Sequence, residues 1–165
     1  MTDLIFRLAG LLLLRRGPQD LPPGWPALFF SIAAYVAVTA FNLSRGDGHP
    51  TPVAVITLAV GLPLTLTWIV LKIRQRTGRW VQTLTALFGS NALLSVLTLP
   101  FSLAAGSEPN MGLALILLTS FFWSFAVDAH IWRHALEISF AAALVVTMLL
   151  FVISLFVITS LTGPL

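Results

Sequence analysis

The sequence contains no cysteine and few charged residues, and both shortages limit what the protein can be. Without cysteine, disulfide bonds, thiolate catalysis and cysteine-based zinc sites are excluded. Charged residues make up only 9% of the 165 positions, apolar residues make up 58%, and the mean hydropathy is +0.96. These values lie outside the range of soluble globular domains. We therefore expect an all-α integral membrane protein.

Charge is absent from five long stretches of the sequence, at 26–43, 53–71, 81–106, 111–127 and 138–165. A helix needs about 20 apolar residues to cross a bilayer. We therefore predict a single membrane domain over 1–165, a polytopic bundle with five transmembrane helices at about 26–43, 53–71, 81–105, 111–131 and 137–161. No ionisable side chain lies deep in any of these predicted spans, because residues 128–132 are placed at headgroup level.

The segment 4–16 is apolar with helical spacing but is too short to cross the bilayer. Four leucines between positions 4 and 12 share one face of a helix, which predicts an amphipathic helix in the membrane interface. A signal peptide is not expected, for three reasons. The acidic Asp3 stands where a signal peptide has basic residues, Arg7 interrupts the apolar stretch, and no small-residue cleavage site follows.

Lys and Arg are distributed unequally among the segments outside the spans. The N-terminal segment and the second and fourth connections carry eight of the nine, whereas the first connection carries only Arg45. Positive charge is retained in the cytoplasm. We therefore expect a bacterial inner-membrane protein with a cytoplasmic N-terminus and a periplasmic C-terminus. Trp25, Trp80 and Trp132 lie at span ends on the same predicted face, where tryptophan is enriched.

The same basic residues are candidates for contact with anionic lipid headgroups or an acidic partner. Alternatively, these basic residues serve only to fix the orientation of the helices in the membrane. We expect membrane lipids, a membrane-protein partner or a second copy of the chain as partners, and no nucleic acid, although the pI is near 10.7. Small residues four apart, at Ala33 and Ala37 and at Thr85 and Gly89, permit the close helix packing that such association needs. The seven candidate contacts are Arg7, Arg15, Arg16, Lys72, Arg74, Arg76 and Arg79.

Two residues interrupt the apolar character of the spans, Pro63 in the second and Asn91 in the third. We expect Pro63 to kink its helix because it lacks an amide donor, and Asn91 to hydrogen-bond a neighbouring helix. The alternative is that both line a solute pathway. A polar cavity joining Pro63 to Asn91 would favour a small transporter or channel, and dry apolar packing would favour a non-enzymatic adaptor.

The densest polar stretch is 128–137, which includes His130, His134 and Glu137. On one continuous helix these three residues would share a face and offer two nitrogens and a carboxylate to zinc. However, the chain must reverse direction here between the fourth and fifth spans, so we expect a solvated, salt-bridged connection and no metal. No nucleotide-binding motif, nucleophile elbow or intramembrane catalytic dyad is present. We therefore expect no catalytic residues and no cofactor.

Two stretches resemble the bacterial members of the Yip1 family. They are residues 79–90, RWVQTLTALFGS, and 132–139, WRHALEIS, in a chain with five closely spaced helices, a basic second connection and a cytoplasmic N-terminus. The resemblance implies a membrane adaptor that acts through partners, and in eukaryotes the family is associated with Rab GTPases and vesicle traffic. For this chain it implies an organising or assembly factor of the inner membrane.

The charge distribution generates a prediction about topology. Reversing all four basic residues between positions 72 and 79 removes half of the cytoplasmic positive charge, so we expect it to perturb the orientation in which the helices insert. Reporter fusions after Leu71 and at Leu165 measure this orientation. An unchanged orientation would contradict the assignment.

Overall fold

Six α-helices and two short 3-10 helices form the protein in a computed structural model, which describes residues 2–45, 51–104 and 110–163 and has no strand among them. Five helices are long and apolar enough to cross a membrane. This confirms the all-α membrane fold. The long helices are α2 (Trp25–Ser44), α3 (Pro52–Ile73), α4 (Trp80–Ala104), α5 (Met111–Leu136) and α6 (Phe140–Thr162). The short ones are α1 (Thr2–Leu12), η1 (Pro18–Asp20) and η2 (Thr77–Arg79).

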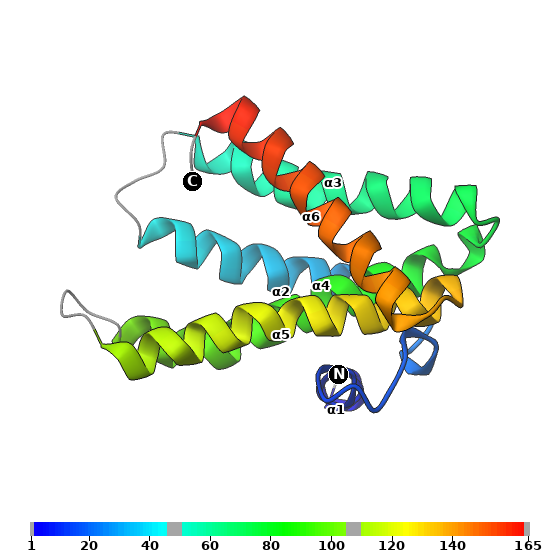
Figure 1. Cartoon of the computed structure of the whole chain (residues 1–165), viewed down its shortest axis with the longest axis horizontal. Coiled ribbons are helices and arrows are strands. Elements are labelled where there is room, and N and C mark those ends of the chain that lie inside the picture. Colours follow the sequence, from blue (N-terminus) through cyan, green and yellow to red (C-terminus); the bar gives the residue numbers. More distant parts are fainter. Residues whose placement is uncertain (1, 46–50, 105–109, 164–165) are drawn as a thin grey trace.

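Helix α4 is the centre of the bundle. It contacts α1, α2, α3 and α5, whereas α6 packs against α5 and α3. Figure 1 shows α6 crossing obliquely from the end of α5 toward the beginning of α3. We call the end of the bundle that carries residues 72–80 and 136–140 the basic end, and the opposite end the far end. Thr85 and Gly89 of α4 are buried in the packing, whereas Ala33 and Ala37 of α2 are exposed.

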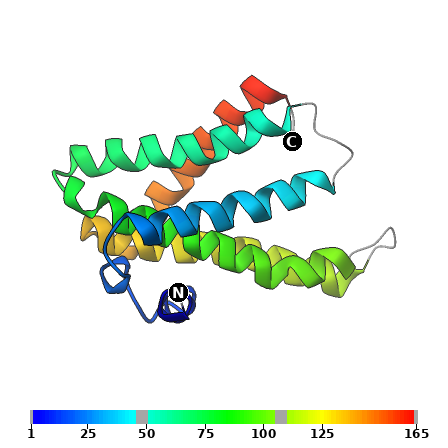
Figure 2. The same cartoon turned by 180° about the vertical axis from the view of Figure 1, so that it is seen from behind.

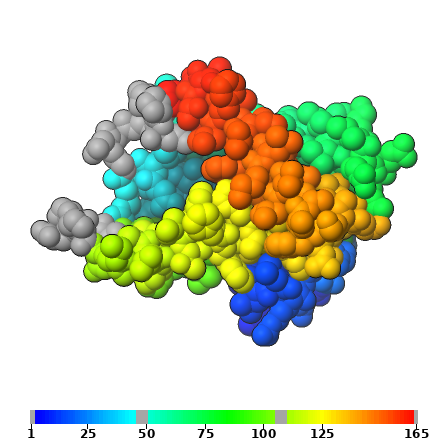
Figure 3. Space-filling model, in the orientation of Figure 1, coloured from blue at the N-terminus to red at the C-terminus, as the bar shows by residue number. Residues whose placement is uncertain are grey.

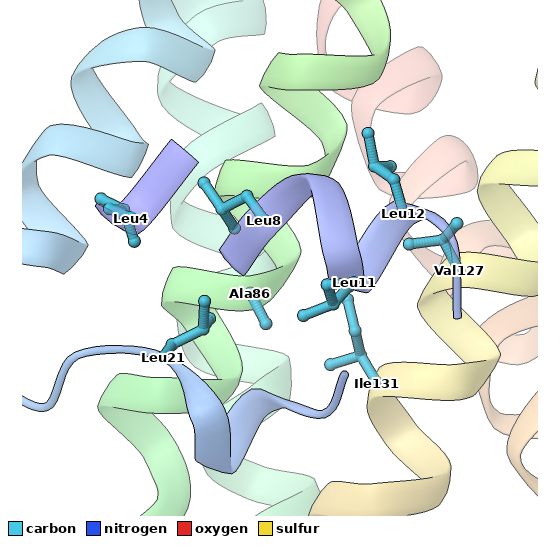
Figure 4. Close-up of a cluster of buried hydrophobic side chains, with 8 residues drawn as sticks. All are labelled: Leu4, Leu8, Leu11, Leu12, Leu21, Ala86, Val127 and Ile131. Atoms are coloured by element: carbon cyan, nitrogen blue, oxygen red, sulfur yellow. The ribbon is translucent and has the colours of Figure 1, made fainter. Parts of the chain in front are cut away.

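The leucine face of α1 packs against protein. Its four leucines are buried beside Ala86 of α4 and Val127 and Ile131 of α5 (Figure 4). Helix α1 is seen end-on in Figures 1 and 2, so it crosses the long helices steeply. The amphipathic helix is confirmed, but α4 and α5 cover the face that we expected to enter lipid. Placement of α1 in the membrane interface stays a prediction, which now rests on the exposed side chains of Phe6 and Leu13.

Hydrogen bonds to α5 hold the chain that follows α1. The indole Nε1 of Trp123 donates to the backbone oxygen of Leu12 at 3.0 Å. One ring nitrogen of His130, Nε2, lies 3.0 Å from the backbone oxygen of Arg16. These contacts satisfy one carbonyl group in the last turn of α1 and one beyond its end, where no helical donor is available.

The predicted connection at 128–137 is wrong, because α5 continues through it to Leu136. Only three residues reverse the chain. Glu137 adopts the left-handed conformation, with φ 54° and ψ 51°, and the Ser139 hydroxyl caps α6 by accepting from the Ala142 amide at 3.3 Å. Asp128 consequently lies inside a helix of membrane-spanning length, eight residues before its end, and not in a connection.

Close approach of α1 to α4 depends on Gly89. A Cβ at this position would lie 2.7 and 2.8 Å from the methyl carbons of Leu8 and 3.1 Å from the hydroxyl of Ser31. No such neighbour lies within 4 Å of the Cβ position at Gly61 of α3. The two glycines therefore form a matched pair in which only Gly89 lacks space for a side chain.

We predict that Gly89→Leu displaces α1 and lowers the free energy of unfolding by about 1–3 kcal/mol through overpacking. Unfolding by SDS in mixed micelles measures the change, and Gly61→Leu is the control, expected to be close to neutral. Displacement of α1 is read from thiol labelling of Leu11→Cys, a fully buried position. Equal stability of the two leucine variants would show that α1 does not depend on this contact.

Candidate functional site

An amide and a carboxyl group meet between α4 and α5. The Asn91 Nδ2 donates to the Asp128 Oδ1 at 3.1 Å and to the backbone oxygen of Leu87 at 2.9 Å. The hydrogen bond that we predicted from Asn91 to a neighbouring helix is therefore confirmed. Its acceptor, Asp128, escaped the sequence analysis because we placed that residue in a connection.

Asp128 has little to neutralise it. Within the described ranges, Asn91 is its one hydrogen-bond donor, and no Lys, Arg or His forms an ion pair with it. In a helix of membrane-spanning length, a carboxylate without a counter-ion is costly, so a proton or a cation on this group would stabilise it. Ionisable residues within membrane-spanning helices generally mark ion or solute sites.

A cavity of about 310 Å³ surrounds this pair, and we call it the Asp128 cavity. All five long helices contribute to its wall, and Pro63 of α3 lines it together with Asn91 of α4. Figure 3 shows α2 recessed between α6 and α5 on the face from which the bundle is viewed. Besides Tyr35 and Trp132, the side chains with polar groups that line the cavity are Thr67, Asn91, Ser124, Asp128, Thr147 and Ser154. This cavity joins Pro63 to Asn91, and apolar side chains supply most of its lining around these polar groups.

Aromatic rings form much of the remaining wall. Phe121, Phe125 and Phe151 contact one another edge to face, with ring centroids 5.0–6.1 Å apart. Tyr35 of α2 and Phe88 of α4 form a second pair at 5.2 Å. The faces of aromatic rings carry partial negative charge.

A second cavity, of about 260 Å³, adjoins the first and shares Asn91, Phe121 and Ser124 with it. Its other lining residues lie later in α4 and earlier in α5, so it extends from the Asp128 cavity toward the far end. The hydroxyls of Thr98 and Ser120 line it and donate to carbonyls of their own helices at 3.0 and 2.8 Å. Their oxygens therefore remain available as acceptors.

Pro63 lies within α3, which continues on both sides of it as one helix. The hydroxyl of Thr65 donates to the backbone oxygens of Gly61 and Leu62 at 2.9 and 3.0 Å. From α4, the Trp80 Nε1 donates to the backbone oxygen of Leu64 at 3.2 Å. The kink stays a prediction, and the structure adds that this proline lines the Asp128 cavity.

The three candidate metal ligands are engaged separately. The His130 and His134 rings lie edge to face on α5 with centroids 4.6 Å apart, and His130 also contacts the backbone of Arg16. Glu137 lies beyond the helix end and binds two arginines. Over the described ranges, no group of three His, Asp or Glu side chains is arranged to hold a metal ion.

Arg76 and Arg79 join the two connections of the basic end through Glu137. Their guanidinium groups donate to the two carboxylate oxygens of Glu137 at 2.6 Å each. Arg79 also donates to the backbone oxygens of His134 and Ala135, at 3.0 and 3.2 Å, where α5 has run out of helical donors. Hydrogen bonds from Arg76 and then Arg79 lower the pKa of Glu137 from 4.5 to about 2.

The other five basic candidates divide into engaged and exposed side chains. Arg7 pairs with Asp3 at 2.8 Å and donates to the backbone oxygen of Asp20. The Lys72 ammonium lies 4.4 Å from the centroid of the Trp68 ring. Available for lipid or partner contact are the exposed side chains of Arg15, Arg16 and Arg74.

Comparisons with protein-family models, with curated proteins and with solved structures found no match for this chain. The resemblance to the Yip1 family therefore stays a prediction. The case for a function rests on the geometry of the Asp128 cavity and on the chemistry of its lining.

The ion pairs of Glu137 generate a prediction about pH. Because the folded-state pKa is lowered, the stabilisation is complete above the ordinary value of 4.5 and is lost as the pH falls toward 2. Melting temperatures in detergent, measured between about pH 6 and pH 2.5, should fall for the unaltered chain. Glu137→Gln should begin lower and vary less over this window. Parallel pH profiles would indicate that these bridges do not stabilise the turn.

Proposed function

We propose that the protein is a small, non-enzymatic membrane transport protein whose solute site is the Asp128 cavity. The observation that carries the proposal is this cavity, which joins Pro63 of α3 to Asn91 and Asp128 at the α4–α5 contact. Its volume of about 310 Å³ is at the lower end of the range for sites that hold small organic molecules.

A purely structural role explains the carboxyl group poorly. Helix packing in a membrane is served by small residues and neutral amides, whereas an isolated acid costs free energy there. Asp128 has one amide donor and no basic partner among the described residues, so these residues do not offset this cost. A ligand that interacts with the carboxyl group would recover it.

The two ends of the bundle differ in a way that suits transport. At the basic end, Glu137 ties the α3–α4 connection to the α5–α6 turn through Arg76 and Arg79. Toward the far end, the second cavity continues from Asn91 past Thr98. This difference supports a solute site that is open toward the far end and closed toward the basic end in the conformation described. From the distribution of Lys and Arg, we propose that the basic end faces the cytoplasmic side of a bacterial inner membrane.

An adaptor is the second candidate function. The observation in its favour is the group of exposed basic side chains at Arg15, Arg16 and Arg74, which suits anionic lipid or an acidic membrane-protein partner. An adaptor has no need of an accessible cavity. Access to the cavity from water therefore distinguishes the two functions.

Thiol labelling tests this access directly, because the natural chain has no cysteine. Ser124→Cys places a thiol where the two cavities adjoin, and Val145→Cys, on the exposed surface of α6, is the control. In proteoliposomes, a water-soluble methanethiosulfonate reagent should label Ser124→Cys several-fold faster than Val145→Cys, and from the far-end side.

Arg74→Cys, exposed at the basic end, reports how the protein is oriented in the vesicles. Slow labelling of both Ser124→Cys and Val145→Cys from either side would contradict the transport proposal. That result would favour the adaptor.

A further inference from the structure

We infer that the Asp128 cavity binds an organic cation with an apolar body, for example a quaternary ammonium that carries a phenyl group, in exchange for a proton held by Asp128. This inference rests on the proposed function, because it names the ligand class of the same site. Three observations support it: a carboxyl group with no ion-pair partner in the described ranges, the aromatic wall and the lack of basic side chains in the lining.

The charges around the cavity favour a positive ligand. Tyr35 of α2 is the one other titratable residue in the described lining, and the lining residues of α3, α4 and α6 carry no titratable group. On α5 itself, His130 is directed to the backbone of Arg16. An anionic ligand would meet Asp128 without a basic residue to offset the repulsion, whereas a cation supplies the missing counter-charge.

The shape and chemistry of the wall select an apolar cation over a small inorganic one. Phe121, Phe125 and Phe151 form one aromatic group in the lining, and Tyr35 and Phe88 form a separate aromatic pair. Aromatic faces attract quaternary ammonium groups and also bury apolar surface. A small metal ion would instead require several oxygen ligands, and Asp128 is the only carboxylate in the lining.

Proton and cation compete for the same carboxyl group. Without ligand, the carboxyl group at this depth is neutral because a proton occupies it. When the cation enters, the O–H bond of Asp128 breaks, the proton leaves to water and the carboxylate pairs with the ammonium, so one positive charge replaces another. Cation affinity therefore rises with pH, and one proton is released for each cation bound.

The test uses the purified full-length chain in detergent and radiolabelled benzyltrimethylammonium, whose charge cannot be lost by deprotonation. We expect saturable binding that unlabelled benzyltrimethylammonium displaces. Its uncharged isostere, neopentylbenzene, and the anion phenylacetate should not displace it. A pH-indicator dye in weakly buffered solution should report release of about one proton per cation.

Two pairs of variants locate the site. Asp128→Asn keeps a group of the same shape beside Asn91, and we expect it to weaken binding at least about tenfold and to abolish proton release. Asp3→Asn, an exposed acid on α1, is the control. Phe151→Leu should weaken binding several-fold, and Phe156→Leu, which lies on the exposed surface of α6, should leave it unchanged.

The outcomes separate this inference from the proposed function. If Ser124→Cys is accessible but benzyltrimethylammonium does not bind, or binds Asp128→Asn equally well, the ligand class is wrong and the transport proposal stands. If the cation binds without proton release, the exchange is overturned. If Ser124→Cys is inaccessible, the transport proposal itself fails, whatever the result with the cation.

Discussion

The contact between Asn91 and Asp128 is the interaction on which the interior of the bundle depends. It joins α4, the most buried of the long helices, to α5 by a side-chain hydrogen bond of 3.1 Å. Between membrane-spanning helices a polar side chain has few hydrogen-bond partners, so the Asn91 amide and the Asp128 carboxyl bind each other. Their hydrogen bond fixes the position of α4 relative to α5 at this level. The same pair leaves the Asp128 carboxyl group without a basic partner among the described residues, and this gives the cavity its chemistry.

The depth of Asp128 follows from the turn after α5. Because Glu137 adopts a left-handed conformation and binds Arg76 and Arg79, the chain reverses within three residues and α5 extends to Leu136. Eight residues of helix then separate Asp128 from the helix end, a rise of about 12 Å. A longer and looser connection would leave the carboxyl group near the headgroups, where water can solvate the charged carboxylate. The salt bridges at the basic end therefore contribute to the site without touching it.

Hydrophobic runs were sufficient to predict five long helices and the apolar face of α1, because both depend on local composition and periodicity. The position of Asp128 within α5 was missed because residues 128–132 were placed at headgroup level, next to a connection. Two signals in the sequence pointed to it: Asn91 needed a partner on another helix, and His130 and His134 keep a four-residue spacing that continues α5. The cavity depends on side chains from five helices, and no pattern along the chain encodes such a convergence.

One face of α5 packs against α1, and another face lines the Asp128 cavity. This arrangement determines which helices of the bundle are free to move. Val127 and Ile131 pack against α1, while Asp128 and Trp132, one position later in each case, line the cavity. Helices α4 and α5 are thereby held on several sides, whereas α3 and α6 bury few of their residues. Pro63 lies in one of these less buried helices. If access to Asp128 changes during transport, the change falls on α3 and α6, because moving α4 or α5 would also disrupt their packing against α1.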